Sequence, residues 1–151
     1  MKGFVLDTSV VLKWFSAFGE SDLSKALRLR EEMLEGTAVF VVPELLFYEM
    51  ANALRYNPNL SAKDVNEALD SILDVGFEVR RADKKTMQDA INIAFKYNIT
   101  IYDAYFIALS RVEGKPLITA DYKLTERVKG LRGIIKLLDI YFLNHPHFQR
   151  A

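Results

Sequence analysis

The chain has 151 residues with a formal net charge of zero, 50% hydrophobic and 26% charged residues, and no cysteine. This length suits one domain with a sizeable core, and the composition excludes a disordered or fibrous protein. Without cysteine the chain has no disulfides, thiolate zinc sites or cysteine nucleophiles. No apolar run is long enough to cross a membrane and the first residues do not resemble a signal peptide, so we expect a soluble, cytoplasmic protein.

Apolar spacing predicts short buried strands that alternate with amphipathic helices. The predicted strands span residues 4–6, 39–42, 77–79, 116–119 and 134–137. Helices are expected between them, with a capping box at Ser61 and Asp64 and a left-handed stop at Asn98. This alternation predicts a single α/β domain over residues 1–141, a three-layer α/β/α arrangement with a mainly parallel central sheet. Residues 142–151, which include His145 and His147, are expected to form a frayed tail.

Four acidic residues follow predicted strands or begin the next helix. Asp7 ends the first strand, Asp121 follows the strand at 117–119, Asp103 opens a helix, and Glu49 lies in the helix after Pro43. Ligands of open parallel sheets bind beyond the carboxyl ends of the strands, which gives acids at these positions special weight. Taken one at a time, however, the three aspartates are better explained as helix caps.

Glu49 does not fit the explanation by capping. It lies well inside its helix, where Leu45, Leu46 and Ala53 share its face, and burying a carboxylate there is costly without a cation or a donor. Glu44, by contrast, lies in the first turn of the same helix, where the helix dipole explains it.

Four carboxylates at one edge of a sheet would repel one another in a bare protein. A divalent ion relieves that repulsion, and oxygen ligands without cysteine or histidine favour Mg²⁺ or Mn²⁺ over zinc. Ions in such sites activate water and neutralise charge on a phosphate that is being cleaved. The sequence therefore points to hydrolysis of phosphodiesters.

Four segments in order resemble the motifs of the PIN-domain family, and most of all the VapC-type toxin ribonucleases of toxin–antitoxin pairs. They are DTSVVLKWF at 7–15, PELLFYEMANAL at 43–54, TIYDAY at 100–105 and TAD at 119–121. The resemblance spans residues 3 to about 138. It implies a PIN-like nuclease domain, a metal-dependent endoribonuclease that uses Mg²⁺ or Mn²⁺, and an antitoxin protein as partner.

The resemblance also implies roles for individual residues. The acidic quartet that holds the metal and catalyses cleavage would be Asp7, Glu49, Asp103 and Asp121, and the hydroxyls of Ser9 and Thr119 would support it. On charge alone, the basic C-terminal third is better explained as a solvated helix face than as a nucleic-acid contact. Beside such a site the same stretch becomes a candidate contact for the RNA backbone, through Lys123, Arg127, Lys129 and Arg132.

An apparent excess of apolar residues adds one expectation. The segment 46–48, with Trp14, Phe15 and Phe18, offers more apolar surface than a small core needs, which predicts a homodimer.

Three other functions compete with this interpretation. A non-catalytic PIN-like module that binds RNA or protein is one, and the complete quartet argues against it. A phosphoacceptor receiver domain is another, but it requires paired acids after the first strand, which this chain lacks. Sequence-independent cleavage of DNA by a flap-type nuclease is the third, although such an enzyme normally needs a larger chain.

Overall fold

The computed structural model describes residues 2–15, 22–142 and 148–150. Five strands of this part of the chain form one parallel sheet in the order β3-β2-β1-β4-β5. The strands are β1 (Lys2–Leu6), β2 (Ala38–Pro43), β3 (Glu78–Arg80), β4 (Leu117–Thr119) and β5 (Ile134–Lys136). The five predicted strands are therefore confirmed, with ends that shift by one or two residues.

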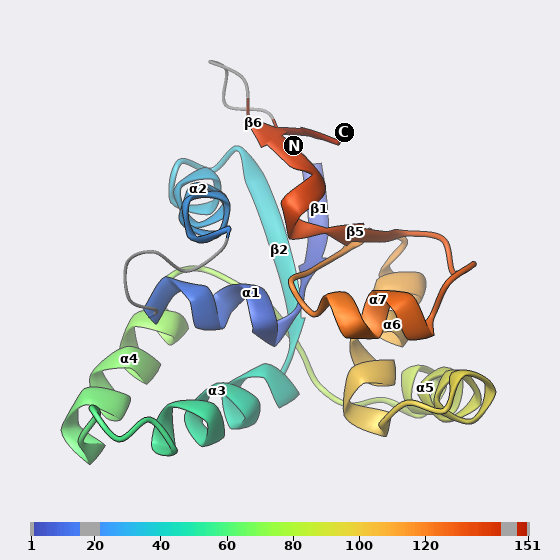
Figure 1. Cartoon of the computed structure of the whole chain (residues 1–151), viewed down its shortest axis with the longest axis horizontal. Helices are drawn as coiled ribbons and strands as arrows, with labels where there is room; N and C mark the ends of the chain where they lie inside the picture. The colour runs from blue at the N-terminus through green and yellow to red at the C-terminus, as the bar shows by residue number, and fades with distance from the viewer. Residues whose placement is uncertain (1, 16–21, 143–147, 151) are drawn as a thin grey trace.

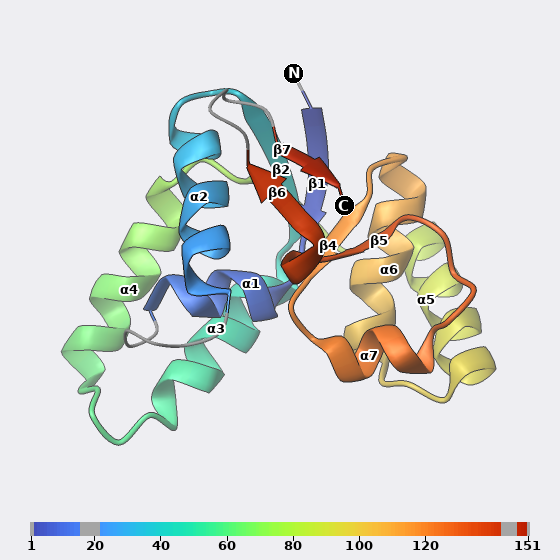
Figure 2. The ribbon, with the colours of Figure 1, turned by 45° about the horizontal axis from the view of Figure 1, so that its top comes forward.

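Helices cover both faces of the sheet, and Figures 1 and 2 show the two layers on opposite sides of β1 and β2. One layer holds α1 (Thr8–Leu12), the short helix η1 (Lys13–Phe15), α2 (Leu23–Leu34), α3 (Leu45–Arg55) and α4 (Ala62–Asp74). The other holds α5 (Lys84–Tyr97), α6 (Ile101–Glu113) and α7 (Tyr122–Arg127). The predicted three-layer α/β/α domain is confirmed.

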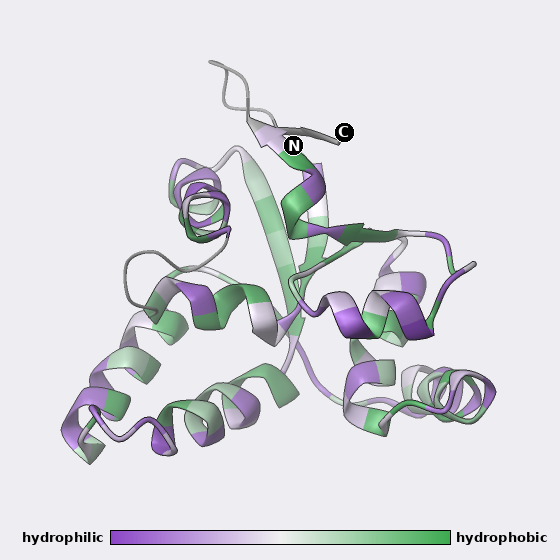
Figure 3. Cartoon of the chain, in the orientation of Figure 1, coloured by the Kyte–Doolittle hydropathy of each residue, from purple (hydrophilic) through white to green (hydrophobic). Residues whose placement is uncertain are grey.

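The core lies where α6 packs on the sheet. Residues 104–110 of α6 are all buried, because α5 covers the side of α6 that faces away from the strands. The buried side chains of the strands include Leu6, Phe40 and Ile118, and Figure 3 shows the central strands as mainly apolar. Burying this apolar surface is the main source of stability for the domain.

Local signals in the sequence set the ends of several helices. Ser61 and Asp64 form the expected capping box of α4, with both reciprocal bonds present. Asn98 ends α5 in the left-handed conformation with φ of 53°, as its position predicts.

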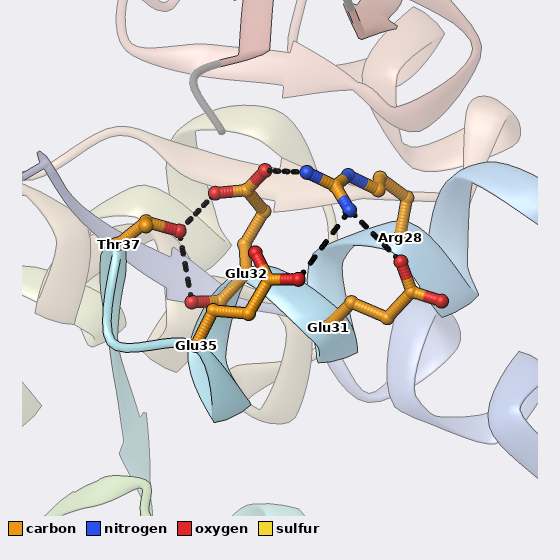
Figure 4. Close-up of polar contacts among 5 residues, drawn as sticks. All are labelled: Arg28, Glu31, Glu32, Glu35 and Thr37. Carbon is orange, nitrogen blue, oxygen red and sulfur yellow. Dashed lines mark hydrogen bonds and ion pairs between the residues drawn. The ribbon is translucent and has the colours of Figure 1, made fainter. Parts of the chain in front are cut away.

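A buried ion pair attaches the end of α2 to the beginning of β2. The Glu32 side chain is 1% exposed and pairs with Arg28 at 2.7 Å, while the Thr37 hydroxyl donates to its carboxylate (Figure 4). Glu31 pairs with Arg28 on the exposed side at 2.9 Å. A carboxylate so deeply buried requires such partners, so this cluster fixes the place of α2 against the sheet.

The C-terminal tail differs from the expectation of a frayed end. After the short helix η2 (Leu137–Asp139), strand β6 (Ile140–Phe142) pairs antiparallel with β7 (Phe148–Arg150). Backbone pairing therefore orders part of this segment, whereas His145 and His147 lie outside the described residues. None of the described helices is both long and apolar enough to cross a membrane.

The order of the strands creates one special junction. From β1 the chain builds outward through β2 to β3, and it then returns across the sheet to β4 on the other side of β1. The connections on the two sides of β1 consequently run over opposite faces. Ligand sites of open parallel sheets form where the strand order reverses in this way, here beyond the carboxyl ends of β1 and β4.

Candidate active site

Asp7 lies at that junction, directly after β1. It is 6% exposed and caps α1, and its carboxylate accepts hydrogen bonds from the Ser9 hydroxyl at 2.5 Å and the Thr119 hydroxyl at 2.9 Å. The Ser9 hydroxyl also accepts from the backbone N–H of Ala120 at 2.9 Å. Ser9 and Thr119 thus join the ends of β1 and β4 and hold one carboxylate between them.

Asp121 follows β4 on the other side of the junction. Its carboxylate accepts from the Leu124 backbone N–H at 3.0 Å and caps α7, while its own N–H donates to the Thr119 hydroxyl at 3.0 Å. The cap explanation and the site explanation are therefore both true of Asp7 and Asp121. A cap fixes the carboxylate in place, which is also what a binding site needs.

The two remaining acids come from the helices. Glu49 lies half-buried on α3 and accepts a hydrogen bond from the Thr8 hydroxyl at 2.8 Å. Asp103 lies half-buried in the first turn of α6, whose cap is Thr100. Neither carboxylate caps a helix, so capping does not account for their positions.

All four acids line one hollow of about 290 Å³, which we call the acidic hollow. Its other lining residues are Thr8, Ser9, Leu12, Asn52 and Ala53. None of the described residues that line it is basic. The structure thus brings the predicted quartet together from four separate segments of the chain.

The pKa values of Asp7, Glu49 and Asp103 are raised, mainly by burial and also by neighbouring carboxylates. Burial is the largest cause of the raised pKa of Asp7, opposed by its hydrogen bonds from Ser9 and Thr119. Burial also raises the pKa of Glu49, to which the charges of Asp7 and Asp103 add. The pKa of Asp103 is raised by burial and then by the charge of Asp121. Holding these groups ionised therefore lowers the stability of the folded protein.

The donor set of the acidic hollow suits a hard divalent cation. It offers carboxylate oxygens, with hydroxyl and amide oxygens nearby and no sulfur or imidazole. Among the described residues, however, no group of three acidic or imidazole side chains is placed closely enough to hold a metal ion as the side chains stand.

Two of the four basic residues suggested for RNA line a hollow together with two of the acids. Lys123 and Arg127 line an adjoining hollow of about 210 Å³ together with Asp103, Asp121 and Leu124, and the charge of Arg127 lowers the pKa of Asp103. Lys129 pairs instead with Glu126 at 2.7 Å on the exposed side of the chain, and Arg132 lies in the bend before β5.

Comparison with known proteins agrees with this geometry. The model of the PIN domain family matches residues 4–130. The chain belongs to the PIN domain family. It is 31% identical over 93 residues to Ribonuclease VapC3 of Pyrobaculum aerophilum. This aligned segment covers 58% of this chain and 70% of that protein. The resemblance found in the sequence motifs is thereby confirmed.

Solved structures share the fold at low sequence identity. A toxin–antitoxin complex from Klebsiella pneumoniae superposes with a TM-score of 0.65 at 16% identity, covering 93% of this chain and 99% of that one. The sarcin–ricin-loop-cleaving toxin VapC20 of Mycobacterium tuberculosis gives a TM-score of 0.61 at 16% identity, covering 81% and 94%. These likenesses show that the PIN domain fold extends over most of the chain.

Sequence reasoning missed two polar residues of the acidic hollow. Thr8 bonds Glu49 across 41 residues of sequence, and Asn52 lines the hollow one turn after Glu49 on α3. The spacing of Asn52 from Glu49 is a signal that could have identified it. The partnership of Thr8 with Glu49 depends on the packing of α1 against α3, which no local pattern specifies.

The raised pKa values predict how stability depends on pH without metal. The folded state binds more protons than the unfolded one above the unfolded carboxylate pKa of about 4, so these groups make unfolding free energy fall as pH rises through their raised values. Asp103→Asn removes one of them. In EDTA at pH 7 this variant should melt roughly 3 °C above the wild type, and the gain should shrink at pH 4.

Asp70→Asn, which changes an exposed carboxylate on α4, is the control for thermal melts at the two pH values and should show no pH-dependent gain. If Asp103→Asn melts below the wild type at pH 7, the carboxylate stabilises the bare fold and the account of repulsion is wrong.

Proposed function

We propose that this PIN domain protein is a Mg²⁺- or Mn²⁺-dependent endoribonuclease that acts in the cytoplasm as the toxin of a toxin–antitoxin pair. The observation that carries the proposal is the convergence of Asp7, Glu49, Asp103 and Asp121 in one hollow where the strand order reverses. Similarity to a protein named as a ribonuclease supports RNA as the substrate.

Metal binding falls to the same quartet in this proposal. Asp7 and Asp121 are preset by their caps, and Glu49 and Asp103 approach from α3 and α6. A bound divalent ion supplies an activated water and neutralises charge on the phosphate.

The surrounding residues of the chain have distinct tasks. Ser9 and Thr119 orient Asp7, and Thr8 orients Glu49. Because the Ser9 hydroxyl donates to Asp7 and accepts from Ala120, it is committed to the site's architecture and is not free to attack phosphorus. In the proposed hydrolysis water is the nucleophile, and Lys123 and Arg127 bind the RNA backbone next to the acids.

A toxin requires an inhibitor, and solved toxin–antitoxin complexes with this fold support an antitoxin protein as partner. The homodimer needs a different argument from the one made on sequence. Trp14 stacks on Phe77 at 5.8 Å and donates to the Ala26 carbonyl at 2.8 Å, while Leu46 is buried, so much of the expected apolar excess packs inside the chain. Phe18 lies outside the described residues.

Exposed apolar side chains on α5 support the dimer instead. Ile91 and Phe95 are one helical turn apart and are 40% and 85% exposed. They form an apolar stripe on α5 that a second copy of the chain would cover.

Cleavage of a labelled single-stranded RNA tests the nuclease directly. With Mg²⁺ or Mn²⁺ the wild type should cut it, and EDTA should abolish cutting. Asp7→Asn, Asp103→Asn and Asp121→Asn should each lower the rate at least ~100-fold, because each removes a ligand from the ion. Asp70→Asn should cleave at the wild-type rate. Cleavage that persists in EDTA or in these three variants would refute the proposal and leave a binding module as the alternative.

Light scattering tests the dimer at about 50 μM, a concentration at which weak interfaces assemble. The wild type should have twice the 17.3 kDa mass of the chain, and Phe95→Glu should be monomeric because it places a charge in the apolar stripe. Leu34→Glu, at an exposed apolar position on α2, should remain dimeric. A wild type that is strictly monomeric would rule out the dimer.

A further inference from the structure

A second hollow lies next to the acidic one, between the beginning of α3, the end of β3 and the beginnings of α5 and α6. Its volume is about 240 Å³, and its lining includes Leu45, Met87, Ile101, Tyr48, Tyr102 and Tyr105. We call it the tyrosine hollow. It is smaller than the roughly 300–1,000 Å³ of sites that enclose a drug-sized ligand, so it suits a single planar ring system.

Two tyrosines at this hollow keep their rings in water. Tyr48 is 75% exposed and Tyr102 is 61% exposed, although both belong to helices whose other faces pack on the sheet. Exposed rings beside an apolar floor provide a surface on which another flat ring can stack.

The third tyrosine of the lining is buried. Tyr105 is 5% exposed, and the Asp83 backbone and the Thr86 side chain, at the beginning of α5, are polar neighbours of its hydroxyl. Because the hydroxyl is covered, Tyr105 adds the apolar surface of its ring to the hollow.

The tyrosines are next to the acids in sequence. Tyr48 directly precedes Glu49 on α3, and Tyr102 directly precedes Asp103 on α6. Successive helix residues point about 100° apart, so each pair directs one side chain to each of two neighbouring hollows. The acids and the tyrosines thus come from the same turns of α3 and α6, and a nucleotide next to a phosphate at the acids would lie toward the tyrosine hollow.

The order of the two hollows and the basic residues along the sheet edge defines a path for single-stranded RNA. The tyrosine hollow lies beyond β3 and β2, the acids lie beyond β1 and β4, and Lys123 and Arg127 follow on α7. Aromatic surface thus lies on one side of the acids and cations lie on the other. Stacking of bases combined with charge along the backbone is how proteins bind single-stranded nucleic acid.

We propose that the tyrosine hollow is a base-binding subsite that takes one unpaired nucleotide of RNA next to the cleaved phosphodiester. This inference rests on the nuclease function proposed above. Tyr48 and Tyr102 stack on the base, and the buried ring of Tyr105 forms part of the apolar floor.

The test compares an RNA of mapped cleavage site with copies that carry one abasic nucleotide at each flanking position. Tyr48→Ala and Tyr102→Ala should each lower kcat/KM about tenfold on the intact RNA. Neither should cause a further loss on the copy that lacks the base at the subsite. Tyr56→Ala is the matched control, because Tyr56 is also 75% exposed, at the end of α3, and does not line the hollow.

A binding measurement keeps the subsite testable apart from catalysis. 2-Aminopurine scanned along the same RNA should lose fluorescence at one position on binding, and Tyr48→Ala with Tyr102→Ala should restore it. If the wild type cleaves but this quenching and the abasic effect are absent, the subsite is wrong and the nuclease proposal stands. If the alanine variants lose activity equally on intact and abasic RNA and change from dimer to monomer, a second copy covers the hollow and the base subsite is refuted.

Discussion

The reversal of strand order between β1 and β4 is the constraint on which the site depends. It places the carboxyl ends of two neighbouring strands where connections leave over opposite faces, so Asp7 and Asp121 line one hollow and α3 and α6 approach it from different layers. Hydroxyls of Ser9 and Thr119 then join the two strand ends through the Asp7 carboxylate. Fold and site are therefore built by the same contacts.

This arrangement sets function against stability. The fold buries Asp7 and half-buries Glu49 and Asp103, and burial raises the pKa of each. Hydrogen bonds from Thr8, Ser9 and Thr119 offset part of that cost without supplying positive charge. What remains is a preorganised negative site whose repulsion a bound cation would relieve, and such a conflict with stability is common at active sites.

Much of this was predictable from sequence, for identifiable reasons. Apolar runs that end in an acid located Asp7 and Asp121, and a carboxylate on an apolar stripe identified Glu49. The bond from Thr8 to Glu49 and the tyrosine hollow were not predictable, because each depends on how separate helices pack. The ion pair of Lys129 with Glu126, three residues earlier, was also not anticipated, because the charge count considered the basic residues together.

The central claim is that the acidic hollow holds a divalent cation, and Mn²⁺ binding tests it most directly. Titrating Mn²⁺ into protein treated with EDTA and then desalted, while following the paramagnetic resonance signal of the free ion, counts the ions bound without any reference to RNA. The account predicts at least one Mn²⁺ per wild-type chain, affinity at least ~10-fold weaker in Asp103→Asn, and unchanged binding in Asp70→Asn. A wild-type chain that binds no Mn²⁺, or an Asp103→Asn variant that binds it as tightly, would contradict the account.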